Sequence, residues 1–222
     1  MKVDAWSPVL SCSVTGWSSG GNKDGQKIWS YEDTELMISS EEGPYTGSIW
    51  GNHKPTSQPL LADLDLDGDA ELVVSAIRES DNSPQVVAIS LPSSGAPSKL
   101  WDKSLGYGSH GSDPVFVQTD ENTAYVMLTT TESTNGAMWL WKLDSSSGDP
   151  SWDGKSLGNL DGDSNVPHIR LPGPIVANLD SDDNPEIIVT IPTDSDSSGT
   201  LDGAEYRGIE VSNGSEKWSY TA

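Results

Sequence analysis

A strand-like segment headed by proline returns four times along the chain, and this repeat constrains the possible folds more than any other sequence feature. The prolines lie 51, 55 and 60 residues apart. Proline is tolerated at the first residue of a strand, where its missing N–H costs no ladder hydrogen bond. Each segment therefore predicts the start of a strand, at Pro8, Pro59, Pro114 and Pro174.

The end of each unit repeats as well. A further strand candidate precedes a tryptophan in every unit, namely TELMIS, QVVAIS, MWLWKLD and RGIEVS before Trp50, Trp101, Trp152 and Trp218. The apolar runs are short and often alternate, and no window keeps the 3.6-residue period of a helix. Turn signals separate these runs, because the chain has 22 glycines and 14 prolines among many Ser, Asn and Asp residues. The sequence predicts an all-β protein.

One small sheet cannot bury its own faces, so the units are expected to pack side by side. Radial stacking of small antiparallel sheets is a β-propeller. We therefore predict a single β-propeller, or a propeller segment, of about four antiparallel blades over residues 1–222. A pair of β-sandwiches is the alternative. Since four blades is the lower limit for propellers, we expect a compact ring or part of a larger one. The predicted blade units are about 7–56, 57–111, 112–170 and 171–222.

The charge balance excludes some classes of partner. Lys and Arg number 12 against 34 Asp and Glu, which gives a formal net charge of −22. Nucleic acids and anionic membranes would repel such a chain. No stretch is long and apolar enough to insert directly into a membrane. The only cysteine, Cys12, cannot form an internal disulfide and is predicted to be a buried small hydrophobe.

The segment ADLDLDGDAELVV places acidic residues at alternate positions before a strand pattern. Alternate side chains of a tight loop converge if a glycine permits the sharp turn, and Gly68 stands where it can do so. Carboxylates and a carbonyl arranged in this way suit Ca²⁺, whereas Mg²⁺ keeps more of its waters. An EF-hand is excluded, because its twelfth position is Val74 here and a strand pattern follows. The predicted ligands are Asp63, Asp65, Asp67, Asp69 and Glu71.

A related loop, ANLDSDDNPEIIVT, occurs in the fourth unit. Asn178 replaces the first acid, which lowers the charge of the loop, and Asp183 replaces the glycine. Aspartate tolerates a left-handed conformation at some cost, so we expect weaker binding. The first and third units lack such a loop, and NLDGDSN at 159–165 is predicted to be a solvated connector. The predicted ligands are Asn178, Asp180, Asp182, Asn184 and Glu186.

At these two segments the chain resembles FG-GAP/VCBS-type repeats, the calcium-loop blades of integrin-α-like propellers. ADLDLDGDAELVV and ANLDSDDNPEIIV follow that family's D-x-D-x-D-G-x-x-[DE] pattern, except for the missing glycine at 183. The ends of the units, such as GIEVSNGSEKW, are similar to PQQ-like propeller repeats. The resemblance implies loops that brace blades, with Asp69 and Asn184 as carbonyl ligands and the other eight residues as side-chain ligands.

The sequence predicts no catalytic residue. His53, His110 and His168 fall in Gly/Pro/Ser-rich connections, where solvated side chains are a simpler interpretation than a metal or catalytic cluster. H-E-x-x-H, G-x-S-x-G and phosphate-binding glycine motifs are absent. A polysaccharide lyase or hydrolase on the same scaffold is the alternative. Trp6 and Trp17 are candidates for exposed contacts with a sugar or a protein.

These features predict a non-enzymatic, calcium-binding propeller that mediates protein or glycan binding in adhesion. We expect a location outside the cell or at the cell surface. The start MKVDAWSP lacks the apolar region of a signal peptide, so we expect a signal to have been removed or to lie upstream. Further blades of the same chain, or a homo-oligomer, are additional expected partners.

Overall fold

The described part of the chain is built from β-strands alone, which confirms the all-β prediction. Within it, no helix has the length and hydropathy that a bilayer crossing requires. For three short strands near the N-terminus only the backbone is described. The computed structural model describes residues 58–78, 83–91, 96–106, 110–132, 136–152, 154–159, 171–180, 182, 184–193 and 201–222, and the strands of 12–17, 27–33 and 36–37.

The first sheet is an antiparallel meander in chain order. β3 (Leu36–Met37) lies on the same side of β5 as β4 does, because both strands pair with β5 and β6 occupies its other edge. β3 comes from the predicted unit 7–56, so it joins the sheet of the following unit. The predicted unit boundaries stay a prediction. The strands of the meander are β4 (Leu60–Ala62), β5 (Glu71–Arg78), β6 (Pro84–Ser90) and β7 (Ser98–Ser104).

Two further sheets repeat this strand order. In the second sheet, two short strands pair with successive parts of β10. The second sheet contains β8 (His110–Gly111), β9 (Val115–Asp120), β10 (Thr123–Thr131), β11 (Ala137–Asp144) and β12 (Lys155–Asn159). The third sheet contains β13 (Ile175–Ala177), β14 (Glu186–Thr193), β15 (Gly203–Glu210) and β16 (Glu216–Thr221). A separate hairpin pairs β1 (Cys12–Trp17) with β2 (Lys27–Asp33).

The predicted strand starts agree with these elements where the structure describes them. Pro59, Pro114 and Pro174 directly precede β4, β9 and β13. Trp101 lies on the closing strand β7 and Trp218 on the closing strand β16. Trp152 differs, since it lies in the connection between β11 and β12. Pro8 and Trp50 lie outside the described residues.

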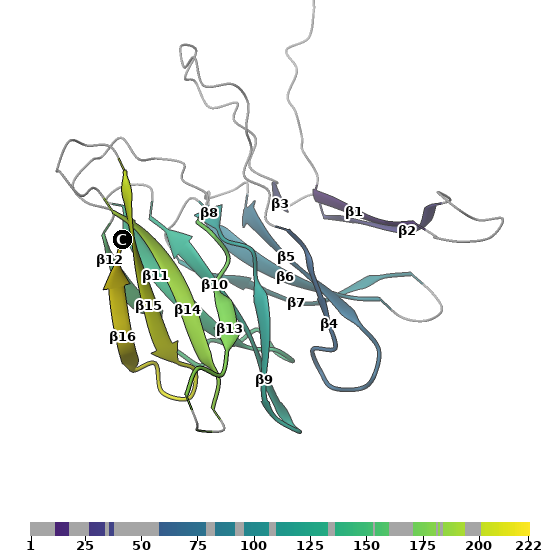
Figure 1. Ribbon diagram of the computed structural model, residues 1–222. Coiled ribbons are helices and arrows are strands. Elements are labelled where there is room, and N and C mark those ends of the chain that lie inside the picture. The colour runs from purple at the N-terminus through teal and green to yellow at the C-terminus, as the bar shows by residue number, and fades with distance from the viewer. Residues whose placement is uncertain are drawn as a thin grey trace, which may run out of the picture.

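The three sheets follow one another in chain order and lie side by side (Figure 1). Each is an open sheet. Their opening strands are neighbours, because β4 contacts β9 and β9 contacts β13. Closure into a ring is not seen among the described residues, so the propeller remains a proposal.

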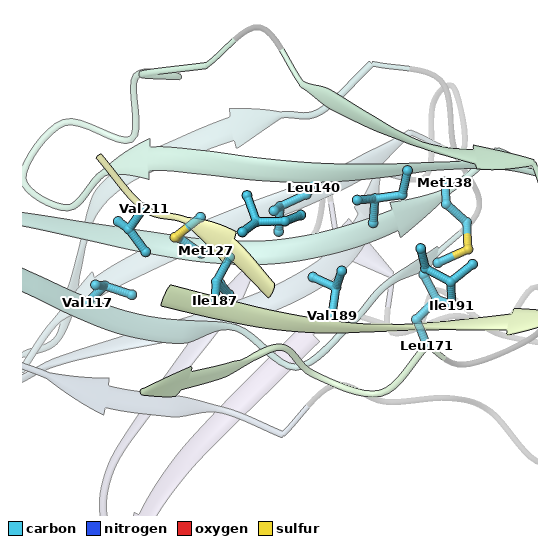
Figure 2. Close-up of a cluster of buried hydrophobic side chains, with 11 residues drawn as sticks. Val117, Met127, Met138, Leu140, Leu171, Ile187, Val189, Ile191 and Val211 are labelled. Atoms are coloured by element: carbon cyan, nitrogen blue, oxygen red, sulfur yellow. The ribbon is translucent and has the colours of Figure 1, made fainter. Parts of the chain in front are cut away.

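Two hydrophobic clusters join the sheets. Alternate residues of β10 point to opposite sides, so that Val126 and Leu128 face the first sheet while Met127 faces the third. Between the second and third sheets, the side chains of Met127, Leu140 and Ile187 lie between the strands in one layer (Figure 2). The second sheet is therefore buried on both faces, and its two faces hold its neighbours in place.

At each of these two interfaces, a tryptophan of one sheet packs on a turn of the next sheet. The Trp101 indole Nε1 donates a hydrogen bond to the Ser145 carbonyl oxygen at 2.8 Å. A Cβ on Gly148 would lie 2.5 Å from the Trp101 ring, and Gly148 has φ of 73°. In the same manner, a Cβ on Gly214 would lie 3.3 Å from the Trp152 ring. Glycine is favoured in each turn because both glycines have φ of 73°, and at Gly148 the indole of the preceding sheet also packs directly on the backbone.

The turn that receives Trp101 is held by one carboxylate. Asp144 Oδ1 accepts hydrogen bonds from the backbone N–H and the hydroxyl of both Ser146 and Ser147. Burial acts to raise the pKa of Asp144, but these hydrogen bonds outweigh it and keep the pKa below its ordinary value. The charged form of Asp144 therefore stabilises the turn.

Candidate metal centre

The loop from Asp63 to Glu71, called the Asp63 loop, is folded around its own carboxylates. Asp63 accepts hydrogen bonds from the backbone N–H groups of Asp67 and Gly68, both at 3.0 Å. Glu71 is the first residue of β5, and its Oε2 accepts from the Leu64 N–H at 2.8 Å. Two carboxylates thus close the loop at its two ends.

The predicted sharp turn is present in this loop. Gly68 has φ of 96° and Leu66 has φ of 61°. A leucine in the left-handed region is strained, because its side chain crowds the backbone there. The hydrogen bonds to Asp63 hold the loop in this shape. Gly68 lies at the sharp turn, as the sequence predicted.

Three of the five predicted ligands converge. One carboxylate oxygen from each of Asp63, Asp65 and Glu71 lies within 4.8 Å of the other two. Asp67 and Asp69 are not part of this group. Instead, Asp67 Oδ1 accepts a hydrogen bond from the Asp69 N–H at 2.8 Å. The three grouped acids could hold a metal ion.

Glu71 differs from the other two acids of this group because its carboxylate is buried, with 2% of the residue exposed. Burial raises the pKa of Glu71. The Leu64 hydrogen bond opposes this shift, while the charges of Asp65, Asp67 and Asp63 add to it. A buried carboxylate among like charges is costly unless a positive charge lies close to it.

The Asp63 loop also contacts the second sheet. Leu64 is buried in the cluster between the first and second sheets. Its carbonyl oxygen accepts a hydrogen bond from the Ser145 hydroxyl. Ser145 in turn receives the Trp101 indole N–H. The order of the loop is therefore coupled to the packing of the two sheets.

The loop from Asn178 to Glu186, called the Asp180 loop, has the same framework. Asp180, Asp182 and Glu186 form a group with one oxygen each within 4.8 Å. Glu186 is fully buried and accepts from the Leu179 N–H at 2.6 Å. The Asn178 amide donates to the Asp182 carbonyl oxygen at 2.6 Å.

Asn184 takes part in the Asp180 loop through its backbone. Asn184 donates its backbone N–H to Asp182 Oδ1 at 2.8 Å. Asp183, which replaces the glycine, lies outside the described residues. The predicted ligand roles of Asn178 and Asn184 stay predictions.

A lysine that the sequence analysis did not single out reaches this second group. Lys217 Nζ lies 2.9 Å from Glu186 Oε1 and 3.2 Å from Asp182 Oδ2, and it also contacts Asp180 Oδ2. A fourth carboxylate, Glu210, lies 2.7 Å from the same ammonium. The hydrogen bonds that this ammonium donates to Asp180, Glu210 and Glu186 raise the pKa of Lys217. The available sequence signal was its place in the closing strand, directly before Trp218.

The structure describes no side chain of the candidate histidines or of Trp6 and Trp17. His53, His168 and Trp6 lie outside the described residues. His110 and Trp17 lie on β8 and β1, but only their backbone is described. The 159–165 connector lies outside them too, apart from Asn159 at the end of β12.

Comparison with known proteins adds no relative. No family model matches the chain, and no curated protein or solved structure matches it either.

Proposed function

We propose that this chain is a calcium-stabilised β-propeller, or a propeller segment, with a calcium ion in the Asp63 loop. The observation that carries the proposal is the buried Glu71 carboxylate grouped with two further acids. Among the described residues, no cationic side chain forms an ion pair with these three acids. Hard oxygen ligands of this kind suit Ca²⁺. The ion would supply the missing positive charge and would brace the loop against the second sheet.

Three observations support the propeller as the architecture. The three sheets share one strand order and lie side by side. Their opening strands β4, β9 and β13 are successive neighbours, as the inner strands of blades would be. A tryptophan of one sheet packs on a glycine turn of the next at both interfaces. The resemblance of the two acidic loops to FG-GAP/VCBS-type repeats is consistent with this arrangement.

Calcium binding is expected to depend on one side chain of the loop and not on its neighbour. Asp65→Asn removes a charged member of the grouped acids, so we expect at least a tenfold loss of calcium affinity in isothermal titration calorimetry. Asp69→Asn is the matched control, because it removes the same charge from a residue proposed to offer only its backbone carbonyl. Equal losses in the two variants, or no binding by the wild-type protein, would contradict the proposal.

We further propose that the module is non-enzymatic and binds a glycan or a protein at the cell surface. Support comes from exposed aromatic residues on one face of the third sheet, where Tyr206 pairs with Tyr220 across β15 and β16 and Trp218 lies next to them. Exposed aromatic faces suit sugar and protein contacts.

A polysaccharide lyase or hydrolase stays the alternative. Such an enzyme would need a free cation for a uronate. Arg207, the arginine whose side chain is described, is instead held at 2.8 and 2.9 Å by both carboxylate oxygens of Glu205.

Ligand binding is expected to depend on this aromatic face. In a glycan array, Tyr220→Ala should weaken binding of any recognised glycan at least tenfold, since stacking on the exposed ring is lost. Glu121→Ala, an exposed change on the second sheet, is the control. Retained binding by Tyr220→Ala would place the contact elsewhere, and an array without bound glycan would favour a protein ligand.

A further inference from the structure

The two acidic loops are set in sheets with the same local register, which allows a residue-by-residue comparison. Glu71 pairs with Ser90 in the first sheet, and Glu186 pairs with Glu210 in the third. The closing strand of each sheet then has a β-bulge at the same place. The bulge leaves Leu100 without a partner between Lys99 and Trp101, and Lys217 without one between Glu216 and Trp218.

The two sheets differ at two positions around the loops. The third sheet has Glu210 where the first has Ser90, and Lys217 where the first has Leu100. The pair adds one negative and one positive charge, so the net charge is unchanged. Leu100 is an exposed apolar side chain, whereas Lys217 extends into the grouped acids of its own loop.

We infer that Lys217 is the resident cation of the Asp180 loop, and that its ammonium holds the position a calcium ion would take. The ammonium contacts all three grouped acids and Glu210. Calcium needs several of the same oxygens at about 2.3–2.6 Å. Two cations cannot share these oxygens, because their charges repel and the space is filled.

The consequence is a division of roles between two loops of similar sequence. The Asp180 loop is neutralised by its own chain and stays folded without metal, while calcium selects the Asp63 loop. Glu186 needs such a partner, because a fully buried carboxylate is costly without a nearby positive charge. That Lys217 neutralises the Asp180 loop follows from its contacts with that loop alone. That calcium binds the Asp63 loop rests on the proposed function.

A charge-neutral double substitution tests the inference. Glu210→Ser with Lys217→Leu gives the Asp180 loop the surroundings of the Asp63 loop. Calcium stoichiometry is measured by isothermal titration calorimetry on the full chain, with circular dichroism as the check of folding. We expect one bound ion in the wild-type protein and two in the double variant. In chelator, the double variant should melt at a lower temperature than the wild-type protein, and calcium should restore it.

The reverse substitution keeps the test decisive if the first variant does not fold. Ser90→Glu with Leu100→Lys installs the lysine beside the Asp63 loop, and it should abolish calcium binding in a folded protein. Retained binding in this variant would overturn the inference. So would two ions in the wild-type protein, or a folded Glu210→Ser, Lys217→Leu variant with no added ion.

These outcomes separate the inference from the proposed function. No ion in the wild-type protein but one in the Glu210→Ser, Lys217→Leu variant would refute calcium in the Asp63 loop and support Lys217 as the resident cation. Two ions in both proteins would support calcium in the Asp63 loop and refute Lys217 as the resident cation. Adding Asp65→Asn to the double variant should remove one of its two ions, which identifies the loop that each ion occupies.

Discussion

Removal of calcium is expected to lower the melting temperature of this protein by about 5–10 °C. An ion that binds only the folded state stabilises it by about 2.7 kcal/mol at one hundred times its dissociation constant. For a chain of 222 residues, each kcal/mol corresponds to about 2–4 °C. The effect is large because the Asp63 loop carries Leu64, whose side chain and carbonyl both contact the second sheet. Differential scanning calorimetry in calcium and in chelator measures the shift.

A variant of the loop separates calcium from other effects of chelator. Asp65→Ala should reproduce most of the loss in calcium buffer. In chelator it should melt no lower than the wild-type protein, because it removes a charge that repels Glu71. Glu121→Ala removes an equal charge from the β9–β10 turn of the second sheet and should leave the calcium shift intact. Identical melting curves with calcium and with chelator would refute a calcium site in the wild-type protein.

The pH dependence in chelator follows from the same carboxylate. Burial raises the pKa of Glu71 in the folded state, so the folded protein binds a proton more readily than the unfolded chain. The contribution of Glu71 to the stability of the metal-free protein therefore falls as pH rises from the ordinary pKa of glutamate through the raised one. Calcium favours the ionised carboxylate and should reverse this trend.

Much of the local structure could be predicted because it depends on neighbouring residues. The strand starts after Pro59, Pro114 and Pro174 follow from the missing proline N–H. The turn at Gly68 follows from its freedom to adopt positive φ. Such features need no knowledge of distant parts of the chain.

Two features that the sequence did not predict depend on pairing across strands. Leu36 and Met37 join β5 of the following unit, and no local pattern specifies that partner. Lys217 meets Glu186 because β14, β15 and β16 are in one register with a bulge at residue 217. A one-residue shift would move that lysine to the other face of the sheet. Its contact with Glu186 therefore depends on the strand register, which no local sequence pattern specifies.

Trp101→Ala is expected to destabilise the protein by about 3–5 kcal/mol, the usual cost of removing a buried aromatic side chain. Trp101 is 7% exposed, packs on Gly148 and is the hydrogen-bond donor to the Ser145 carbonyl oxygen. Truncation opens a cavity between the first and second sheets and leaves that carbonyl without its indole donor. Urea unfolding measures the change in the free energy of unfolding.

The third sheet offers a matched control for this substitution. Trp218 occupies the same register position, next to the bulge of the closing strand, and likewise packs on a glycine, Gly208. It is 36% exposed, whereas Trp101 is buried between two sheets. Trp218→Ala should therefore cost less than about 1 kcal/mol, as surface substitutions commonly do. Equal losses in the two variants would mean that the tryptophan stabilises its own sheet and not the contact with the next one. A large loss for Trp101→Ala alone would show that the stability of the protein depends on the contact between the first and second sheets, as the proposed packing of propeller blades requires.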